Sequence, residues 1–339
     1  MAMDKSSADT YVYAKASGML AKSFVNKRAN LLFSVRSLRE LWSLLFKKEV
    51  PMISEPLLAQ AIEKEACSSF ISQYTSLLKN YDNPSPILPL LLQSFDYENL
   101  KEVSNALNHG QKEVPGIQPI EHYNILKYSA WPDIKEMTKN TPLSWYTSLS
   151  PLEEQAQNDS KIDFTYLEQV WSAVNAIKTS CRQDVISLIR EKIQFETVLW
   201  ALRLRIYYNM TEDEIIPKLF KSATASDLLS PAKKTFSLEL DNYSAWQKWK
   251  FSSYLNPYEE GAFWSLDPVW LSNSYKKHYV NRARHLFHKH PFTECPLFCF
   301  FIIKRNELEL IRTAAESLRL NVGSAQAMKM AGVQEEGNG

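Results

Sequence analysis

Apolar residues recur at intervals of three and four along most of the chain, and this spacing is typical of amphipathic α-helices. The pattern predicts long helices over residues 54–80, 161–177, 183–208 and 293–320. The first half of the last helix is apolar on nearly all sides, which indicates that it is buried. No stretch alternates polar and apolar residues convincingly, as a half-buried β-strand does, so the pattern predicts an all-α protein.

Polar residues mark where several of these helices begin and end. Ser54, followed by a proline in the first turn, opens the first long helix, and Thr211 with Glu214 forms a capping box for a further one. Asp96 is placed to cap a short helix that ends at Gly110. The segments that read as non-helical are 111–119 and 138–160, expected to be connections, and 332–339, expected to be a disordered tail.

The composition agrees with a helical protein, and its balance of charges excludes a strong overall electrostatic field. The chain of 339 residues has only eight glycines, whereas most β architectures need glycine for tight turns and bulges. Its 39 basic and 38 acidic residues give a formal net charge of +1. This balance offers no global attraction for nucleic acid or for an anionic membrane, so we expect neither as a partner.

Cysteine usage and hydropathy bear on the compartment. Four cysteines in a chain of this length predict a reduced, cytoplasmic environment. Residues 1–10 are polar and lack the apolar core of a signal peptide. The longest apolar stretch, residues 296–303, is far shorter than the ~20 residues that span a bilayer. Direct membrane insertion is therefore not expected, and association with a membrane would go through a partner.

A weak internal repeat runs through the predicted helices. Residues 96–100, 194–198 and 307–311 share an order: a polar residue, an apolar one, a glutamate, a variable position and an aliphatic residue. We interpret the three as helix starts. Their spacing is compatible with three helical units of about 100 residues each, which is a common domain size.

One segment near this repeat resembles a family signature. Residues 95–101 are similar to the Asp-x-x-Asn-Leu-Lys signature of the C/d subunit of V-type and archaeal-type rotary ATPases, carried here by Asp96, Asn99, Leu100 and Lys101. The closing helix of that family is matched by residues 293–297 together with Lys304, Glu307 and Arg312. We expect all seven named residues to be structural.

Shorter matches and some departures complete the resemblance. Residues 11–15 resemble the family's N-terminal Tyr-x-Tyr-Ala-Arg, and residues 163–166 resemble its Leu-Asp-x-x-Tyr segment. Ser17 and Gly18 stand where the first helix of the family usually carries arginine, and the aromatic-rich segment 241–292 is unusual for the family. The resemblance therefore suggests a divergent member.

The resemblance implies both a fold and a role. The fold is a funnel of three similar helical domains in a pseudo-threefold arrangement, over residues 10–112, 113–225 and 226–330. The role is that of a non-catalytic connector, present in one copy, between the central axle and the membrane rotor ring. The connector sits on the cytoplasmic face and passes torque during ATP-linked proton or sodium transport. It uses no nucleotide and no other cofactor.

The residues alone also permit a metal site. His278, His285, His288 and His290 precede Cys295 and Cys299, and zinc favours nitrogen and sulfur ligands in tetrahedral geometry. However, both cysteines lie at the start of an apolar helix, one turn apart, where they are typical of small core residues. We therefore expect no metal, and we expect a solvated, partner-facing segment around the histidines.

The same region supplies candidate contact residues. Lys276, Lys277, Arg282, Arg284 and Lys289, together with His285 and His288, form a basic run that could meet acidic groups of an axle or a ring. The alternative is the charged face of a helix whose apolar side is buried. For the aromatic residues of segment 241–292, core packing is the expected role, and a ligand cage is the alternative.

Catalytic motifs are missing from the sequence. It contains no Gly-x-x-x-x-Gly-Lys loop, no Gly-x-Ser-x-Gly elbow and no His-Glu-x-x-His. The leading hypothesis is thus the rotary-ATPase connector, which is not an enzyme. A generic helical scaffold that binds other proteins is the second hypothesis, and a metal-dependent helical enzyme built on the His/Cys segment is the third.

Overall fold

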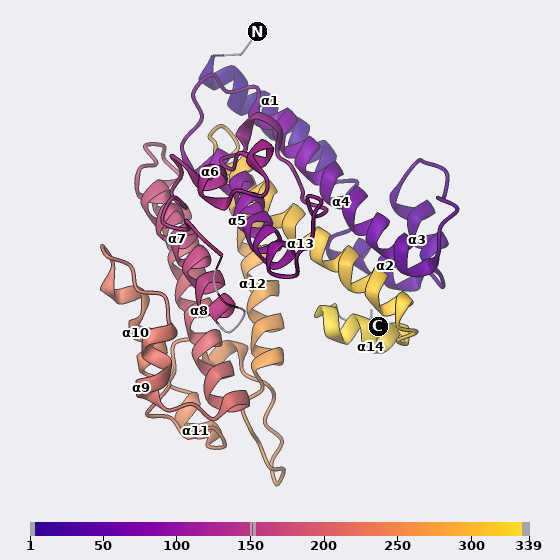
Figure 1. The fold of residues 1–339 in the computed structure, drawn as a ribbon. Coiled ribbons are helices and arrows are strands. Elements are labelled where there is room, and N and C mark those ends of the chain that lie inside the picture. Colours follow the sequence, from indigo (N-terminus) through magenta and orange to yellow (C-terminus); the bar gives the residue numbers. More distant parts are fainter. Residues whose placement is uncertain (1–3, 150, 152–153, 334–339) are drawn as a thin grey trace. The chain divides into compact units, whose positions relative to one another are not determined.

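The structure is a computed structural model that describes residues 4–149, 151 and 154–333. Within these residues it contains fourteen α-helices, short 3-10 turns and loops, and no β-strand (Figure 1). The prediction of an all-α protein is confirmed. None of the helices in the described part of the chain is long and apolar enough to cross a membrane.

The chain forms two compact units, of which the first contains both ends of the chain. It consists of Met1–Pro84, Thr179–Cys181 and Asn273–Gly339. Its α-helices are α1 (Lys5–Leu20), α2 (Asn30–Ser34), α3 (Leu38–Leu45), α4 (Glu55–Leu78), most of α12 (Pro268–Lys289), α13 (Cys295–Arg319) and α14 (Ser324–Ala331). The long helices α4 and α13 pack side by side (Figure 1). Phe301 of α13 lies 5.2 Å, ring to ring, from both Phe70 and Tyr74 of α4.

The second unit consists of Ser85–Lys178 and Arg182–Ser272. Its α-helices are α5 (Ile87–Asn108), α6 (Ile134–Thr138), α7 (Gln155–Asn175), α8 (Arg182–Tyr208), α9 (Glu212–Ile215), α10 (Ser230–Lys233) and α11 (Tyr243–Trp246). Helices α5 and α7 pack together, and so do α7 and α8. Beside α5 and α7, the segment over residues 117–146, which includes α6, adds Leu126, Met137 and Leu143 to the same buried cluster. The predicted division into three repeats differs from these two units, and it stays a prediction.

The periodicity located most of the long helices within a few residues. Helix α4 begins after Ser54, with a proline in its first turn, and α8 and α13 match the predicted 183–208 and 293–320 closely. The capping box of Thr211 and Glu214 is present at α9. Helix α7 begins at Gln155, six residues before the predicted start, because the mostly polar residues before Lys161 continue the helix by a turn and a half.

The prediction for Asp96 is wrong. Helix α5 begins at Ile87, so Asp96 lies in the middle of a 22-residue helix and caps nothing. The proline at position 89 falls in the first turn, where a backbone N–H has no partner inside the helix, and the helix therefore tolerates it. The C-terminal end is as expected, since the residue after His109 is Gly110 with φ of +69°.

Residues 332–339 were expected to form a disordered tail, but the first of them, Gly332, belongs to the end of a helix. Gly332 follows α14 with φ of +68°, a left-handed conformation that glycine adopts without strain. Residues 334–339 lie outside the described residues.

The aromatic segment is partly core and partly surface. Trp246, Trp249 and Phe251 are buried, and the Phe251 ring packs edge-on against Phe195 of α8 at 5.3 Å. By contrast, Phe263 is 84% exposed. Core packing thus accounts for Trp246, Trp249 and Phe251, whereas Phe263 faces solvent.

The two phenylalanines give a direct test of this difference. Phe251→Ala removes a fully buried ring and should lower the free energy of unfolding by about 3–5 kcal/mol. Phe263→Ala, the matched control in the same segment, should change it by less than about 0.5 kcal/mol. Urea denaturation followed by circular dichroism measures both. Equal effects of the two substitutions would contradict the assignment of Phe251 to the core.

Candidate functional site

The first site residue, Asp96, holds a distant loop against the middle of α5. Its side chain is fully buried. The backbone N–H groups of Ile125 and Leu126 donate to Asp96 Oδ2 at 2.5 and 3.3 Å, and the Tyr128 hydroxyl donates to Oδ1. A buried carboxylate without such donors would be strongly unfavourable, so the loop and the carboxylate stabilise each other.

Asn99, one turn further along α5, secures the preceding part of the same loop. Its Nδ2 donates to the Gln118 carbonyl at 2.9 Å, and its Oδ1 accepts from the Gln118 N–H at 3.0 Å. Nδ2 also contacts the Tyr128 hydroxyl at 2.7 Å. The Asp-x-x-Asn spacing therefore puts two polar side chains on one helix face, where together they fix residues 118–128.

The rest of the signature joins α5 to α7. Leu100 is fully buried in the core cluster of the unit. Lys101 Nζ pairs with Asp163 Oδ1 at 2.5 Å, and the ring of Tyr97 packs on Tyr166 at 5.0 Å. The structure thus brings two of the sequence-predicted motif segments, 95–101 and 163–166, together along one helix seam.

A second buried polar side chain occupies the repeat position in α8. Gln194 is 5% exposed, and its Nε2 donates to the Asp227 carbonyl at 3.0 Å. Its Oε1 accepts from Lys250, whose ammonium also lies 5.1 Å from the centre of the Phe251 ring. Burial lowers the pKa of Lys250 from its usual value. As in α5, a side chain in mid-helix binds loops that are distant in sequence.

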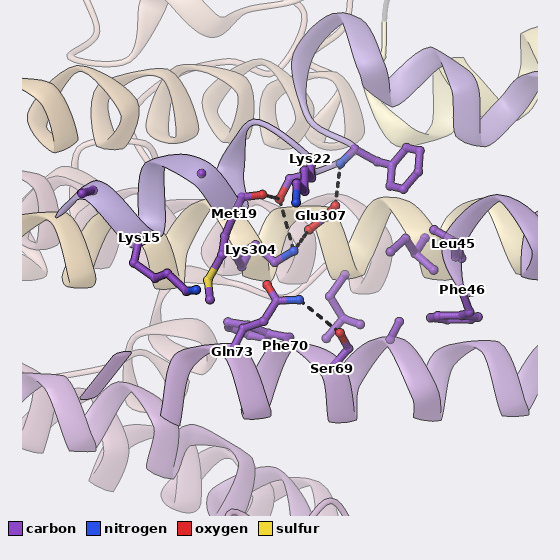
Figure 2. Close-up of a pocket in the computed structure, with 17 residues that line it drawn as sticks. Lys15, Met19, Lys22, Leu45, Phe46, Ser69, Phe70, Gln73, Lys304 and Glu307 are labelled. Carbon is purple, nitrogen blue, oxygen red and sulfur yellow. Dashed lines mark hydrogen bonds and ion pairs between the residues drawn. The ribbon is translucent and has the colours of Figure 1, made fainter. Parts of the chain in front are cut away.

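The third repeat position is Glu307 in α13, and it holds a loop near the N-terminus. Glu307 Oε1 accepts the backbone N–H of Phe24 at 2.5 Å, and Oε2 pairs with Lys304 (Figure 2). Lys304 Nζ also donates to Ser23 Oγ at 3.2 Å. Both charged side chains are almost fully buried, so the pair is compensated mainly by its own hydrogen bonds.

Asp96, Gln194 and Glu307, which we call the buried polar positions, therefore share one structural role. The interpretation of these segments as helix starts is wrong, because each residue lies in the middle of a long helix. A polar residue surrounded by apolar ones at a helix start can cap the helix, but in mid-helix it must find partners elsewhere. Its partners here are loops that the sequence pattern did not identify.

An open hollow of about 620 Å³ lies beside the Lys304–Glu307 pair, and we call it the Lys304 hollow. Lys15 and Lys22 of the N-terminal segment lie along it, and Gln73 and Ser69 of α4 are hydrogen-bonded to each other on the opposite side (Figure 2). Gly18 also lines it, and a Cβ there would meet no atom within 4 Å. The hollow thus has a basic and polar rim around a pair whose charges cancel.

The predicted contact residues lie on α12, and they differ in their surroundings. The apolar side of this helix is buried at Tyr275, Ala283 and Phe287, as expected for a helix with one charged face. Lys276 forms an ion pair with Glu309 of α13. Arg284 is exposed and borders a pocket. Lys277, Arg282 and Lys289 also have interactions within the chain. Their role toward a partner stays a prediction.

The remaining motif residue, Arg312, makes an exposed ion pair. Its Nε lies 3.1 Å from Glu63 Oε2 of α4, and its side chain is 62% exposed. The pair therefore adds to the α4–α13 contact at the surface.

The His/Cys segment is arranged as core and surface. Cys295 and Cys299 are buried, with their sulfurs 3.7 Å apart. The hydrogen bond to Cys295 and burial raise the pKa of the Cys181 thiol, which keeps it protonated. His288 Nδ1 instead contacts the Tyr13 hydroxyl at 3.1 Å. In the described part of the chain, no group of three or more His, Cys, Asp or Glu side chains could hold a metal ion.

Sequence reasoning missed the basic residues near the N-terminus that border these cavities. Lys22 lines the Lys304 hollow, and Lys27 and Arg28 line a neighbouring pocket. A signal was available, because residues 10–39 contain six basic residues and no acidic one.

Comparison with known proteins identifies the class. The ATP synthase (C/AC39) subunit family matches residues 9–330. A protein of Treponema pallidum (strain Nichols), described as uncharacterized, is 26% identical over 332 residues, which cover 97% of each chain. The chain belongs to the ATP synthase (C/AC39) subunit family, the non-catalytic C/d subunits of V- and A-type ATPases. The resemblance inferred from the motifs is therefore confirmed.

The first site prediction concerns the pH dependence of stability. Burial raises the pKa of Asp96 above 3.8, and the hydrogen bonds from Tyr128, Ile125 and Leu126 oppose this shift only in part. Between the folded-state pKa and 3.8, the native protein holds a proton that the unfolded chain has lost. The free energy of unfolding of the wild type, relative to Asp96→Asn, should therefore rise as the pH falls through this window and level off below it.

Urea denaturation of both proteins at a series of pH values measures this difference. The exposed Asp241→Asn variant serves as the control, and its difference from the wild type should not show the same rise. If the free energies of unfolding of the wild type and of Asp96→Asn differed by a constant amount over the whole pH range, the buried carboxyl would not titrate as described.

The second site prediction compares two basic residues of the closing-helix motif, Lys304 and Arg312. Lys304→Met leaves the Glu307 carboxylate buried without its cation and should lower the free energy of unfolding by about 3–5 kcal/mol. Arg312→Met breaks an exposed pair and should cost about 1 kcal/mol or less. Chemical denaturation measures both, and a smaller loss for Lys304→Met than for Arg312→Met would contradict the analysis.

Proposed function

We propose that this chain is the connector of a rotary V/A-type ATPase, coupling the central axle to the membrane rotor ring on the cytoplasmic side. In this role it passes torque during ATP-linked proton or sodium transport, catalyses no reaction, and is present in one copy. Its association with the membrane is peripheral and goes through the ATPase complex.

The observation that carries the proposal is the family match over residues 9–330, almost the whole chain. The buried polar contacts support it, because an element that transmits torque must resist local unfolding. Asp96 and Glu307 each tie a loop to the middle of a long helix by hydrogen bonds within the interior. Such contacts are stronger in a low-dielectric interior than in water.

The proposal includes a pseudo-threefold funnel built from residues 10–112, 113–225 and 226–330. Its support is the shared role of the three buried polar positions. In each case a side chain in mid-helix binds the backbone of a loop, at Ile125, Asp227 and Phe24 respectively. The loop of the third position comes from the N-terminal part of the chain, so in this arrangement the first segment would complete the last unit.

The contact surface of the connector is proposed to include the basic face of α12. Lys276, Lys277, Arg282, Arg284 and Lys289 belong to this helix, and a rotor neighbour with acidic groups would complement them. Arg284 is one of the exposed candidates, and it borders a pocket.

Reconstitution tests the proposed function. The purified full-length chain should co-elute with the axle subunits and with the solubilised rotor ring of the same ATPase, and should link the two. Removing the chain from the complex should abolish ATP-driven ion uptake into vesicles while the catalytic head still hydrolyses ATP.

Two results would contradict the proposal. One is that the chain binds neither the axle nor the ring under conditions in which those subunits assemble with their other partners. The other is that vesicles without the chain retain ion uptake coupled to ATP hydrolysis. A scaffold of another kind would give the first result together with an unchanged ATPase.

A further inference from the structure

Two segments without acidic residues border a common pocket in the first unit. Residues 10–39 and 268–293 each contain several lysines and arginines and no aspartate or glutamate. The pocket has a volume of about 600 Å³ and twelve lining residues, none of them acidic. We call it the Arg284 pocket. Its size is within the range of about 300–1,000 Å³ that is typical of ligand pockets.

The pocket combines an apolar interior with a basic rim. The apolar part is formed by Leu20, Val25, Phe287 and Ile303, of which Phe287 and Ile303 are almost fully buried. The basic part is formed by Lys27, Arg28, Arg284 and His288. This differs from the Lys304 hollow, where Glu307 neutralises the buried lysine.

Several rim groups are held in place before any partner binds. Arg28 Nε donates to the Ser23 carbonyl at 3.2 Å, and its guanidinium lies 5.3 Å from the centre of the Phe24 ring. His288 is fixed by its contact with Tyr13. Asn26, with φ of +54°, turns the chain where the basic residues begin. A preorganised rim lowers the entropy cost of binding.

The charge of the rim selects the partner. Lys27 and Arg284 are exposed, and within the described residues neither is paired with an acidic side chain. Carboxylates are the complementary groups, and the apolar floor calls for a large apolar side chain between them. A free inorganic anion would use only the rim and leave the floor uncovered.

We propose that the Arg284 pocket binds an acidic protein segment that inserts an aromatic or large aliphatic side chain between flanking carboxylates. The inference rests on the proposed function only for the source of the segment, a neighbouring subunit of the same ATPase. The chemistry of recognition follows from the pocket itself and is testable without the complex.

The test uses a blocked peptide, Glu-Glu-Phe-Glu-Glu, as probe for the full-length protein. Titration calorimetry or fluorescence anisotropy should show binding that weakens as salt is added. Arg284→Glu and Lys27→Glu should each weaken it at least about tenfold, by replacing attraction with repulsion. Replacing the central phenylalanine of the peptide by alanine should weaken it by about tenfold or more, because burial of the ring is lost.

Matched controls separate this site from general charge effects. Lys221→Glu makes the same charge change at an exposed residue that does not line the pocket, and it should leave the affinity within about twofold. Arg284→Gln, which removes the charge without adding one, should give an intermediate loss. Circular dichroism and the urea midpoint check that each variant is folded.

Several outcomes would overturn the inference. Equal affinity of the wild type, Arg284→Glu and Lys27→Glu for the peptide would do so, and so would undetectable binding to the wild type. Competition by phosphate or decanoate at concentrations below that of the peptide would assign the pocket to a small anion or an amphiphile. Arg284-dependent binding to anionic vesicles in preference to the peptide would assign it to lipid. None of these results bears on whether the chain joins axle and ring.

Discussion

A polar side chain buried in the middle of a long helix must find its hydrogen-bond partners outside that helix, and this requirement shapes both units. The helix backbone satisfies its own N–H and C=O groups, so the partner has to be a loop or another helix. Asp96, Gln194 and Glu307 are all 5% exposed or less, and each one bonds to the backbone of a loop. The loops therefore gain fixed positions that apolar packing alone would not specify.

The three positions meet the same requirement with different chemistry. Asp96 has only N–H and O–H donors around it, so its negative charge is stabilised by dipoles and its pKa is raised by burial. Glu307 has a cation next to it in Lys304. Gln194 is neutral and uses both ends of its amide, one toward a carbonyl and one toward Lys250. What the three side chains have in common is a hydrogen bond to a backbone group of a loop. This common feature is a property of the fold and not of one residue type.

Hydrophobic periodicity was sufficient to predict the long helices, but it was insufficient to predict the contacts of the buried polar positions. Helices α4, α8 and α13 were predicted well because their apolar stripes are long and their ends carry ordinary signals. Asp96 was misplaced because an aspartate before an apolar stripe is also a capping signal, whereas the helix begins nine residues earlier, at Ile87. Its partners lie about 30 residues away, and no local pattern encodes a pairing over that distance.

Site residues could be predicted where they match a family signature. They could not be predicted where a contact or a pocket depends on residues that are distant in sequence. The signature identified Lys304 and Glu307, but not that Phe24 completes their contact. The basic run on α12 was visible from its composition, yet the pocket beside Arg284 also requires Lys27 and Arg28 from a distant segment. A charge pattern describes one segment at a time, whereas a pocket is formed by two.

The distribution of satisfied and unsatisfied charge separates the parts of the molecule that maintain the fold from those available to a partner. Asp96, Asn99 and Glu307 have their polar atoms engaged inside the protein, and a bound partner could use them only by breaking those bonds. Exposed charges such as Lys27 and Arg284 carry no such cost. A chain can therefore keep this fold through a few buried polar contacts while its binding surface changes freely. Extensive overall divergence, as in the relative that is 26% identical over 97% of its length, is compatible with such an arrangement.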